Sequence, residues 1–191
     1  IRRQRQMCIR DRGKSDLTIL TFAAGTATDL LAAAGAVRRW EGIYSGLFWY
    51  GQSYNFRRGV EAGTIEVRDF SESAMVARLR AAAQGLSFAP TKALLGTDMA
   101  RYNPDQVREI TCPFTGERYH AVPAAEADFT LLHGYMADSY GNIQMPVVRD
   151  SDDVDYLFAL GSKRLIVTVE KIVPHEVIQQ RPLLTYIPHI L

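Results

Sequence analysis

Polar and glycine-containing segments follow four apolar runs that have the length and composition of buried β-strands. In an open parallel sheet, ligands bind outside the carboxyl ends of the strands, so side chains in such segments are the first candidates for a binding site. The segments are residues 23–26, 45–52, 91–98 and 134–142.

Two of these segments permit two interpretations. Residues 90–98 combine a glycine, hydroxyls, Lys92 and a carboxylate, and such a loop could present backbone N–H groups to an anion. The spacing alone favours a turn in which Asp98 caps the next element. Residues 138–142 form either a ligand loop or a tight turn. Because Asn and Gly adopt positive φ at low cost, the turn is the simpler interpretation.

The other reactive side chains match no familiar site. The four histidines lack metal-ligand spacing, and the two cysteines form no CxxC motif, so we expect no metal site. The sequence also lacks GxGxxG, GxxxxGK[ST] and GxSxG motifs. We interpret Cys112 as a structural thiol, His133 as a satisfied, half-buried side chain and Glu72 as an acid in a first helical turn. An acidic run is interpreted as a helix start and a solvated face: Asp150, Asp152, Asp153 and Asp155.

Composition narrows the class of protein. The chain has 191 residues, 47% hydrophobic and 23% charged, which is typical of a soluble globular protein. A net charge of +1 gives no general reason to expect nucleic-acid binding. No apolar stretch is long enough to span a membrane, and the arginines near the start precede no apolar signal region. We therefore expect a cytoplasmic, reducing location and no membrane partner.

Alternating strand-like and helical patterns predict the architecture. Apolar strands alternating with helices imply a largely parallel sheet covered on both faces, in a single α/β domain. Residues 107–122 instead read as a surface β-hairpin around Pro113–Gly116. The predicted strands are 17–22, 37–45, 64–67, 86–90, 129–133 and 165–169, and the predicted helices are 29–34, 54–62, 72–84 and 151–161.

An ordered series of motifs carries a resemblance to a known family. From about Asp16 to Leu191 the chain resembles the A (alpha) subunit of family I coenzyme A transferases, especially the glutaconate CoA-transferase type. The motifs that carry it are residues 55–67, 81–86, 88–92, 95–98, 112–117, 122–124 and 137–144.

This resemblance implies a fold and a reaction. It implies a three-layer α/β/α fold with a mostly parallel sheet, as in sugar-phosphate isomerases, plus the small hairpin. It further implies that a partner B (beta) subunit carries a glutamate that forms a glutamyl-CoA thioester, while CoA moves from an acyl-CoA to a small carboxylic or dicarboxylic acid. Coenzyme A is then a substrate, with no tightly bound cofactor. No catalytic residue is expected in this chain: Glu72 lies in Ser-Glu-Ser-Ala, without the Asn-Gly of the family's Ser-Glu-Asn-Gly motif.

Within that scheme this chain would supply walls and hydrogen-bond donors to the substrate and to the oxyanion that forms on it. The candidates are chosen by their position after predicted strands. They are Ser45, Gly46, Gln52, Gly96, Thr97, Gly141 and Asn142. Arg57 and Arg58 could pair with a second carboxylate of a dicarboxylic substrate, although a solvated helix face is the favoured interpretation.

Three further expectations remain open. Related heterodimers hydrolyse ring-derived acyl-CoA in steroid catabolism, so this chain could be the A subunit of such a hydrolase. Five arginines in residues 1–13 could instead make it a non-catalytic module with a basic nucleic-acid-binding tail. We favour the view that residues 1–13 are a non-native or disordered tail, because residues 7–12 resemble a translated sequencing adapter. Residues 14–191 would then form the A-subunit domain, truncated at both ends.

Overall fold

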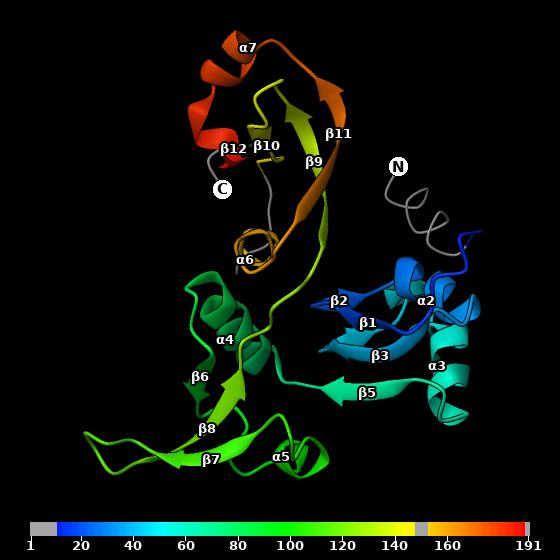
Figure 1. The fold of residues 1–191 in the computed structure, drawn as a ribbon, viewed down its shortest axis with the longest axis vertical. Helices are drawn as coiled ribbons and strands as arrows, with labels where there is room; N and C mark the ends of the chain where they lie inside the picture. The colour runs from blue at the N-terminus through cyan, green and yellow to red at the C-terminus, as the bar shows by residue number, and fades with distance from the viewer. Residues whose placement is uncertain (1–10, 148–152, 190–191) are drawn as a thin grey trace.

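A computed structural model describes residues 11–147 and 153–189 of the chain. The described strands form four hydrogen-bonded sheets, and helices pack between and beside them (Figure 1). Most of the residues that pair between neighbouring strands do so in parallel strand pairs. The predicted α/β class with mostly parallel pairing is therefore confirmed.

The first sheet is parallel and has the order β1-β3-β5. Its strands are β1 (Leu17–Leu20), β3 (Val37–Gly42) and β5 (Glu66–Asp69), accompanied by helices α2 (Thr26–Ala33) and α3 (Tyr54–Glu61). Trp40 of β3 meets Phe56 of α3 edge to face, with ring centroids 5.4 Å apart. Beyond β1 and β3 the chain continues into a second parallel pair, β2 (Ala23–Ala24) with β4 (Tyr44–Ser45).

An antiparallel sheet of order β6-β8-β7 occupies the lower part of Figure 1. It consists of β6 (Phe88–Thr91), β7 (Arg108–Thr111) and β8 (Arg118–Pro123), with α5 (Met99–Tyr102) between β6 and β7. Helix α4 (Glu72–Ala83) contacts β6 and β8. The apolar face of this helix supplies Met75 and Leu79 to a core that also contains Phe70 and Leu94.

The remaining sheet has the order β11-β9-β10-β12 and lies at the top of Figure 1. Strand β9 (Thr130–Ala137) pairs in parallel with β11 (Leu165–Ile172), whereas β10 (Ile143–Gln144) and β12 (Thr185–Ile187) are antiparallel. Helix α6 (Val154–Leu160) contacts both this sheet and α4, and so joins the two regions. Helix α7 (His175–Gln179) and the 3-10 turn η2 (Pro182–Leu184) precede β12.

Most of the predicted elements are present with shifted ends. The helix expected over 72–84 is α4, and Ser71 caps it as expected, because its Oγ accepts a hydrogen bond from the Ala74 N–H at 3.3 Å. The hairpin expected over 107–122 is formed by β7 and β8. Gly35 and Gly85 end helices at φ of +66° and +69°, a conformation that glycine adopts without strain.

Three expectations about strands are wrong in detail. The strand expected over 37–45 divides into β3 and β4, because β3 pairs with β1 and β4 pairs with β2. The loop expected from Gly134 begins only at Asp138, since pairing with β10 and β11 carries β9 on to Ala137. The segment 86–90 joins the hairpin as an antiparallel strand. None of the helices in the described ranges is long and apolar enough to cross a membrane.

Candidate functional site

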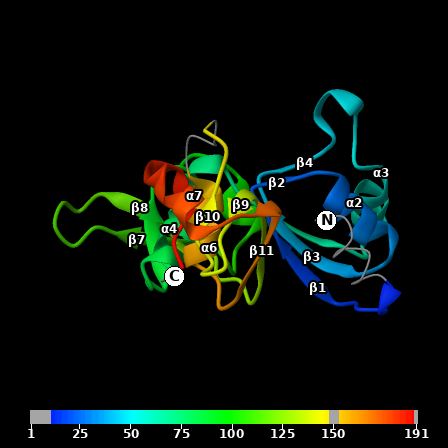
Figure 2. The same ribbon diagram turned by 90° about the horizontal axis from the view of Figure 1, so that it is seen from above.

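The segment after β4 projects from the body of the molecule at the carboxyl edge of the parallel strands, as Figure 2 shows between β4 and α3. The Gly46 N–H donates to the Ala24 carbonyl at 3.1 Å and anchors the segment to β2. The Leu47 N–H donates to the Gly51 carbonyl at 2.8 Å and closes the turn. The 3-10 turn η1 (Phe48–Tyr50) lies inside it. We call residues 46–52 the aromatic loop.

Asp29 of α2 caps the start of α3, the helix that follows the aromatic loop. Its Oδ1 accepts the N–H groups of Asn55 and Phe56 at 2.8 and 3.0 Å, and its Oδ2 accepts the Asn55 side-chain amide at 2.8 Å. A carboxylate is stabilised at a helix N-terminus by the unpaired N–H groups and the helix dipole. The protein's own acid therefore occupies the start of α3, and that helix end offers no site for a ligand anion.

We expect Asp29→Ala to destabilise the protein by about 1–2 kcal/mol, because it removes the cap of α3 and a tie between two helices. Urea unfolding monitored by circular dichroism measures this loss. Asp16→Asn is the control: the Asp16 carboxylate is exposed and lies 3.4 Å from an exposed Arg38, and Asn tolerates the φ of +66° at this position, so a loss of at most about 0.5 kcal/mol is expected. Equal losses for the two variants would contradict the capping role.

Two buried hydroxyls flank the aromatic loop. Ser45 Oγ and Ser53 Oγ have no hydrogen-bond partner in the part of the chain that the structure describes. A buried hydroxyl without a partner costs free energy, so each is a candidate to donate to a ligand or to a partner chain.

Gln52 is exposed, and its Oε1 accepts a hydrogen bond from Arg57 Nη1 at 2.7 Å. Arg57 also pairs with Glu61 on the same exposed helix face, as the solvated-face interpretation expects.

The predicted site residues Gly96 and Thr97 lie in a turn before α5. Gly96 has φ +75° and is exposed. Thr97 uses both its N–H and its hydroxyl to donate to the Leu94 carbonyl, at 3.3 and 2.9 Å. Lys92 is held away from these groups by Glu117 of the hairpin, 3.0 Å from its Nζ. The turn interpretation of residues 90–98 therefore describes the structure, although no bond from the Asp98 side chain caps α5.

The predicted site residue Asn142 belongs to a buried polar cluster, and the exposed Gly141 beside it donates its N–H to the Asp138 carbonyl at 3.2 Å. The Asp138 carboxylate accepts the N–H groups of Tyr140 and Asn142 and the Asn142 side-chain amide, at 2.8–3.0 Å. His175 Nδ1 of α7 lies 2.6 Å from Asp138 Oδ2, and Asn142 Oδ1 accepts the His189 N–H at 3.1 Å. Burial alone would raise the pKa of Asp138, but the hydrogen bonds from Asn142 and His175 outweigh it and hold that pKa well below its ordinary value.

The seven predicted site residues therefore fall in three regions of the chain (Figure 1). Ser45, Gly46 and Gln52 share the aromatic loop and its base. The turn with Gly96 and Thr97 lies near α5 at the bottom of the view, and the turn with Gly141 and Asn142 lies near β10 at the top. The described chain alone brings only the first three together.

A buried ion pair that sequence reasoning missed joins the parallel sheet to α4. Arg78 Nη2 lies 2.8 Å from Glu41 Oε2, and Arg78 Nε donates to the Pro123 carbonyl at 3.0 Å. The guanidinium also stacks 4.1 Å from the centre of the Phe70 ring. Burial lowers the pKa of Arg78, and Glu41 opposes that effect. Its position between Met75 and Leu79 on the apolar face of the predicted helix was the available signal.

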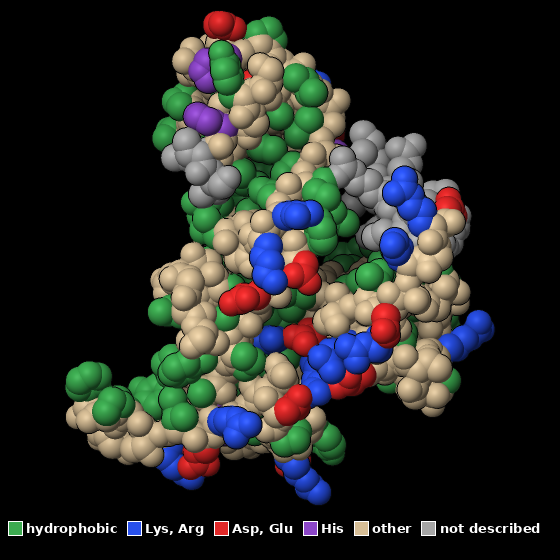
Figure 3. All heavy atoms as spheres, viewed as in Figure 1, with side chains coloured by type: hydrophobic (Ala, Val, Ile, Leu, Met, Phe, Trp, Pro, Cys, Tyr) green, Lys and Arg blue, Asp and Glu red, His purple; other side chains and the backbone are tan. Residues whose placement is uncertain are grey.

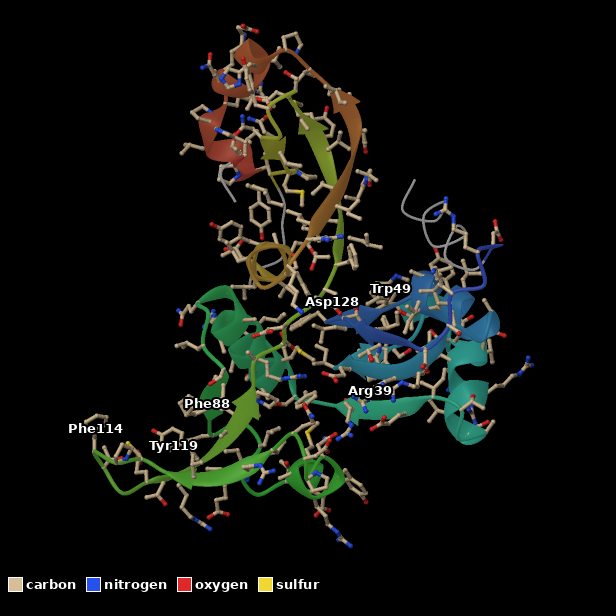
Figure 4. The ribbon with its side chains drawn as sticks, viewed as in Figure 1. Arg39, Trp49, Phe88, Phe114, Tyr119 and Asp128 are labelled. Atoms are coloured by element: carbon tan, nitrogen blue, oxygen red, sulfur yellow. The ribbon has the colours of Figure 1, made fainter. Side chains whose placement is uncertain are left out.

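A charged network lies beside this pair on the surface. Arg39 Nε lies 2.8 Å from Glu66 Oε2, and Arg68 pairs with both Glu66 and Asp105. Figure 3 shows these basic and acidic side chains intermingled where Figure 4 labels Arg39. Because each charge has an opposite neighbour, the network presents no field of one sign to a charged ligand.

Two hollows adjoin α4. A groove of about 570 Å³ between α4 and β6 is lined by Glu72, Arg80, Phe88 and Pro90, among others, and Figure 4 labels Phe88 in it. A second hollow, of about 320 Å³, adjoins Glu41 and Arg78. Glu72 is exposed in the first turn of α4, as expected, and no hydrogen bond or ion pair from a described residue positions its carboxylate for attack.

The structure also places the other side chains that were considered for reactivity. His133 Nδ1 lies 2.9 Å from Thr168 Oγ1, so it is satisfied, although it is exposed and not half-buried. Cys112 is partly exposed at the hairpin turn, where hydrogen bonds from the Thr115 hydroxyl and nearby backbone N–H groups lower its pKa. Residues 11–147 and 153–189 contain no group of three or more His, Cys, Asp or Glu side chains able to hold a metal. Asp150, Asp152 and most of the basic tail lie outside the described residues.

Comparisons with known proteins give the family. A family model described as Coenzyme A transferase matches residues 8–191. The A subunit of a 3-oxoadipate CoA-transferase from Pseudomonas knackmussii is 35% identical over 165 residues, covering 85% of this chain and 57% of that protein. A cholesterol ring-cleaving hydrolase IpdA subunit from Rhodococcus jostii is 32% identical over 171 residues, which cover 85% of this chain and 56% of that protein.

A solved structure confirms the fold over almost the whole chain. The glutaconate coenzyme A-transferase from Acidaminococcus fermentans matches 97% of this chain and 62% of that chain, with a TM-score of 0.84 and 28% identity. The expected three-layer α/β/α class agrees with this match. The chain spans little more than half the length of the curated relatives described above. The family model and the 35% identical relative together show that this chain belongs to the coenzyme A transferase family.

Proposed function

We propose that this chain is the A subunit of a heteromeric CoA-transferase that moves CoA from an acyl-CoA to a small carboxylic or dicarboxylic acid. The observation that carries the proposal is the match of residues 8–191 to the family, together with a 35% identical relative named as the A subunit of a CoA-transferase. A B subunit is the partner that such a name implies.

In the proposed reaction, a glutamate of the B subunit takes CoA from the acyl-CoA and forms a glutamyl-CoA thioester. The acyl C–S bond breaks, a C–S bond forms at the glutamate carbonyl carbon, and one glutamate oxygen leaves with the acyl group as its carboxylate. The acceptor acid then takes CoA by the reverse sequence. A carboxylate is a weak nucleophile, so the site must hold the reactants close and stabilise the oxyanion.

This chain would contribute binding groups to that site. Ser45, Gly46 and Gln52 lie at one strand edge, and the unpartnered Ser45 hydroxyl supports a role as a donor to the substrate. The role of the other four candidates in the site stays a prediction: Gly96, Thr97, Gly141 and Asn142. They lie in two other regions of this chain, so they could contact the substrate only if the full assembly brings those regions to the site. The exposed, unpositioned Glu72 carboxylate supports placing the nucleophile on the partner.

Acceptor dependence tests the proposed reaction. The full-length A and B subunits, purified together, are expected to form a new acyl-CoA only when a free carboxylic acid is present, as followed by liquid chromatography and mass spectrometry. The control replaces the acceptor with buffer. Consumption of acyl-CoA in buffer alone, without exchange, would contradict the transferase reaction.

A related hydrolase is the second candidate. The 32% identical relative named a cholesterol ring-cleaving hydrolase subunit is the observation that favours it. In that case the complex would cleave a carbon–carbon bond of a ring-derived acyl-CoA with water. The same assay separates the two, because incorporation of ¹⁸O from labelled water into a ring-opened CoA product, independent of any acceptor acid, is expected only of the hydrolase.

A further inference from the structure

The aromatic loop exposes three consecutive aromatic side chains. The exposed fractions are 63% for Phe48, 93% for Trp49 and 87% for Tyr50. Large aromatic side chains in water are costly, and a contiguous exposed apolar patch marks an interaction site. Figure 2 shows the loop standing clear of the helices and strands around it, and Figure 4 labels Trp49.

The loop is held in one conformation. Phe48 has φ of +53°, a region that bulky residues rarely adopt and that costs free energy. Three backbone hydrogen bonds inside the loop, and the packing of the Phe48 ring on the Tyr44 ring with centroids 5.1 Å apart, maintain this conformation. A preorganised loop loses little conformational entropy on binding, which favours a tight contact.

The size of the patch fits a protein interface. Fully exposed aromatic side chains each offer about 150–250 Å², so the three together can bury about 500 Å². A standard interface buries about 800 Å² per partner. The segment from Tyr44 to Asn55 also contains no charged residue, and charged residues are depleted in interface cores.

We propose that the aromatic loop is a docking surface for the B subunit, with Trp49 as its central anchor. The inference rests on the proposed function, because it takes the partner from the A-subunit relatives. The loop follows the strand that ends at Ser45, and it is flanked by the Ser45 and Ser53 hydroxyls, which have no hydrogen-bond partner among residues 11–147 and 153–189. A partner seated on the loop would therefore also cover this edge, so that docking and completion of the substrate site occur at one place.

The test measures the affinity between the subunits. The full-length A subunit, carrying the double substitution Trp49→Ala and Tyr50→Ala, is titrated with the purified B subunit by interferometry. We expect the Kd to rise at least about 30-fold, as for residues at the centre of an interface. Phe114→Ala is the matched control: Phe114 is also 93% exposed but lies at the tip of the hairpin, labelled in Figure 4 far from Trp49, and a change below about 2-fold is expected.

Other results would overturn the proposal. An unchanged Kd for the double variant contradicts docking at this loop. An unchanged Kd with lost binding of CoA to the assembled complex would assign the loop to the substrate instead, and a loss of self-association alone would assign it to a second copy of this chain. If the unaltered subunits do not associate, the proposed function itself fails. Circular dichroism checks that each variant is folded. The single substitution Trp49→Lys provides a second variant, for which the same rise in the Kd for the B subunit is expected.

Discussion

Arg78→Ala is expected to destabilise the protein by about 3–5 kcal/mol. The substitution leaves the buried Glu41 carboxylate without its partner, and an uncompensated buried charge is costly. It also removes the hydrogen bond to Pro123 and the contact with the Phe70 ring. Because domains are stable by only about 5–15 kcal/mol, much of the chain should be unfolded at moderate urea concentrations. Urea unfolding monitored by circular dichroism measures the loss.

Two comparisons identify the buried ion pair as the cause. Arg80→Ala changes an exposed arginine of the same helix and should cost at most about 0.5 kcal/mol. The double substitution Arg78→Met with Glu41→Leu should recover most of the loss, because an apolar pair of similar volume can replace a buried ion pair. A loss for Arg78→Ala no larger than that for Arg80→Ala would contradict the account.

Asp138→Asn is expected to cost about 2–3 kcal/mol at pH 7. The buried carboxylate accepts hydrogen bonds from Asn142 and Tyr140 and pairs with His175, and hydrogen bonds to a charged group are stronger than neutral ones. Because the folded-state pKa of Asp138 is lowered, the unfolded chain binds its proton at a higher pH than the folded chain does. The stabilisation is therefore complete above pH of about 4 and is lost as the pH falls below that value.

The difference in unfolding free energy between the original chain and Asp138→Asn should therefore narrow below pH 4. Chemical denaturation at pH 7 and at pH 3 measures it. Asp128→Asn is the control: among the described residues, the ion-pair partner of Asp128 (labelled in Figure 4) is Lys163 at an exposed position, so this substitution should change stability by at most about 0.5 kcal/mol. A difference that stays constant or widens on acidification would rule out the charged carboxylate as its source.

Local patterns predicted most of the elements, because they depend on neighbouring residues. The period of apolar residues and the Ser71 cap indicated α4, and alternation around Pro113–Gly116 indicated the hairpin. Local patterns did not predict which strands pair with one another to form each sheet. Whether residues 86–90 join the parallel strands or the hairpin depends on hydrogen-bond partners more than 30 residues away, which periodicity does not encode.

The candidate site was predicted only in part for the same reason. Ser45, Gly46 and Gln52 lie on one continuous segment, so their proximity follows from the chain itself. His175 and His189 approach Asp138 and Asn142 across 37 and 47 residues, and no spacing rule links them. The sequence likewise gives no sign that Asp29 is more than an ordinary helical residue. Its capping role arises because α3 packs beside α2 and donates two backbone N–H groups to its carboxylate.

Trapping the covalent intermediate tests the central claim most directly. The full-length A subunit, copurified with its B subunit, is incubated with acyl-CoA and then with borohydride or hydroxylamine. Intact mass and peptide mapping then locate any modified glutamate. The proposed function predicts an adduct on a B-subunit glutamate and none on this chain, Glu72 included. An adduct on Glu72, or acyl-CoA consumed without any adduct, would contradict it.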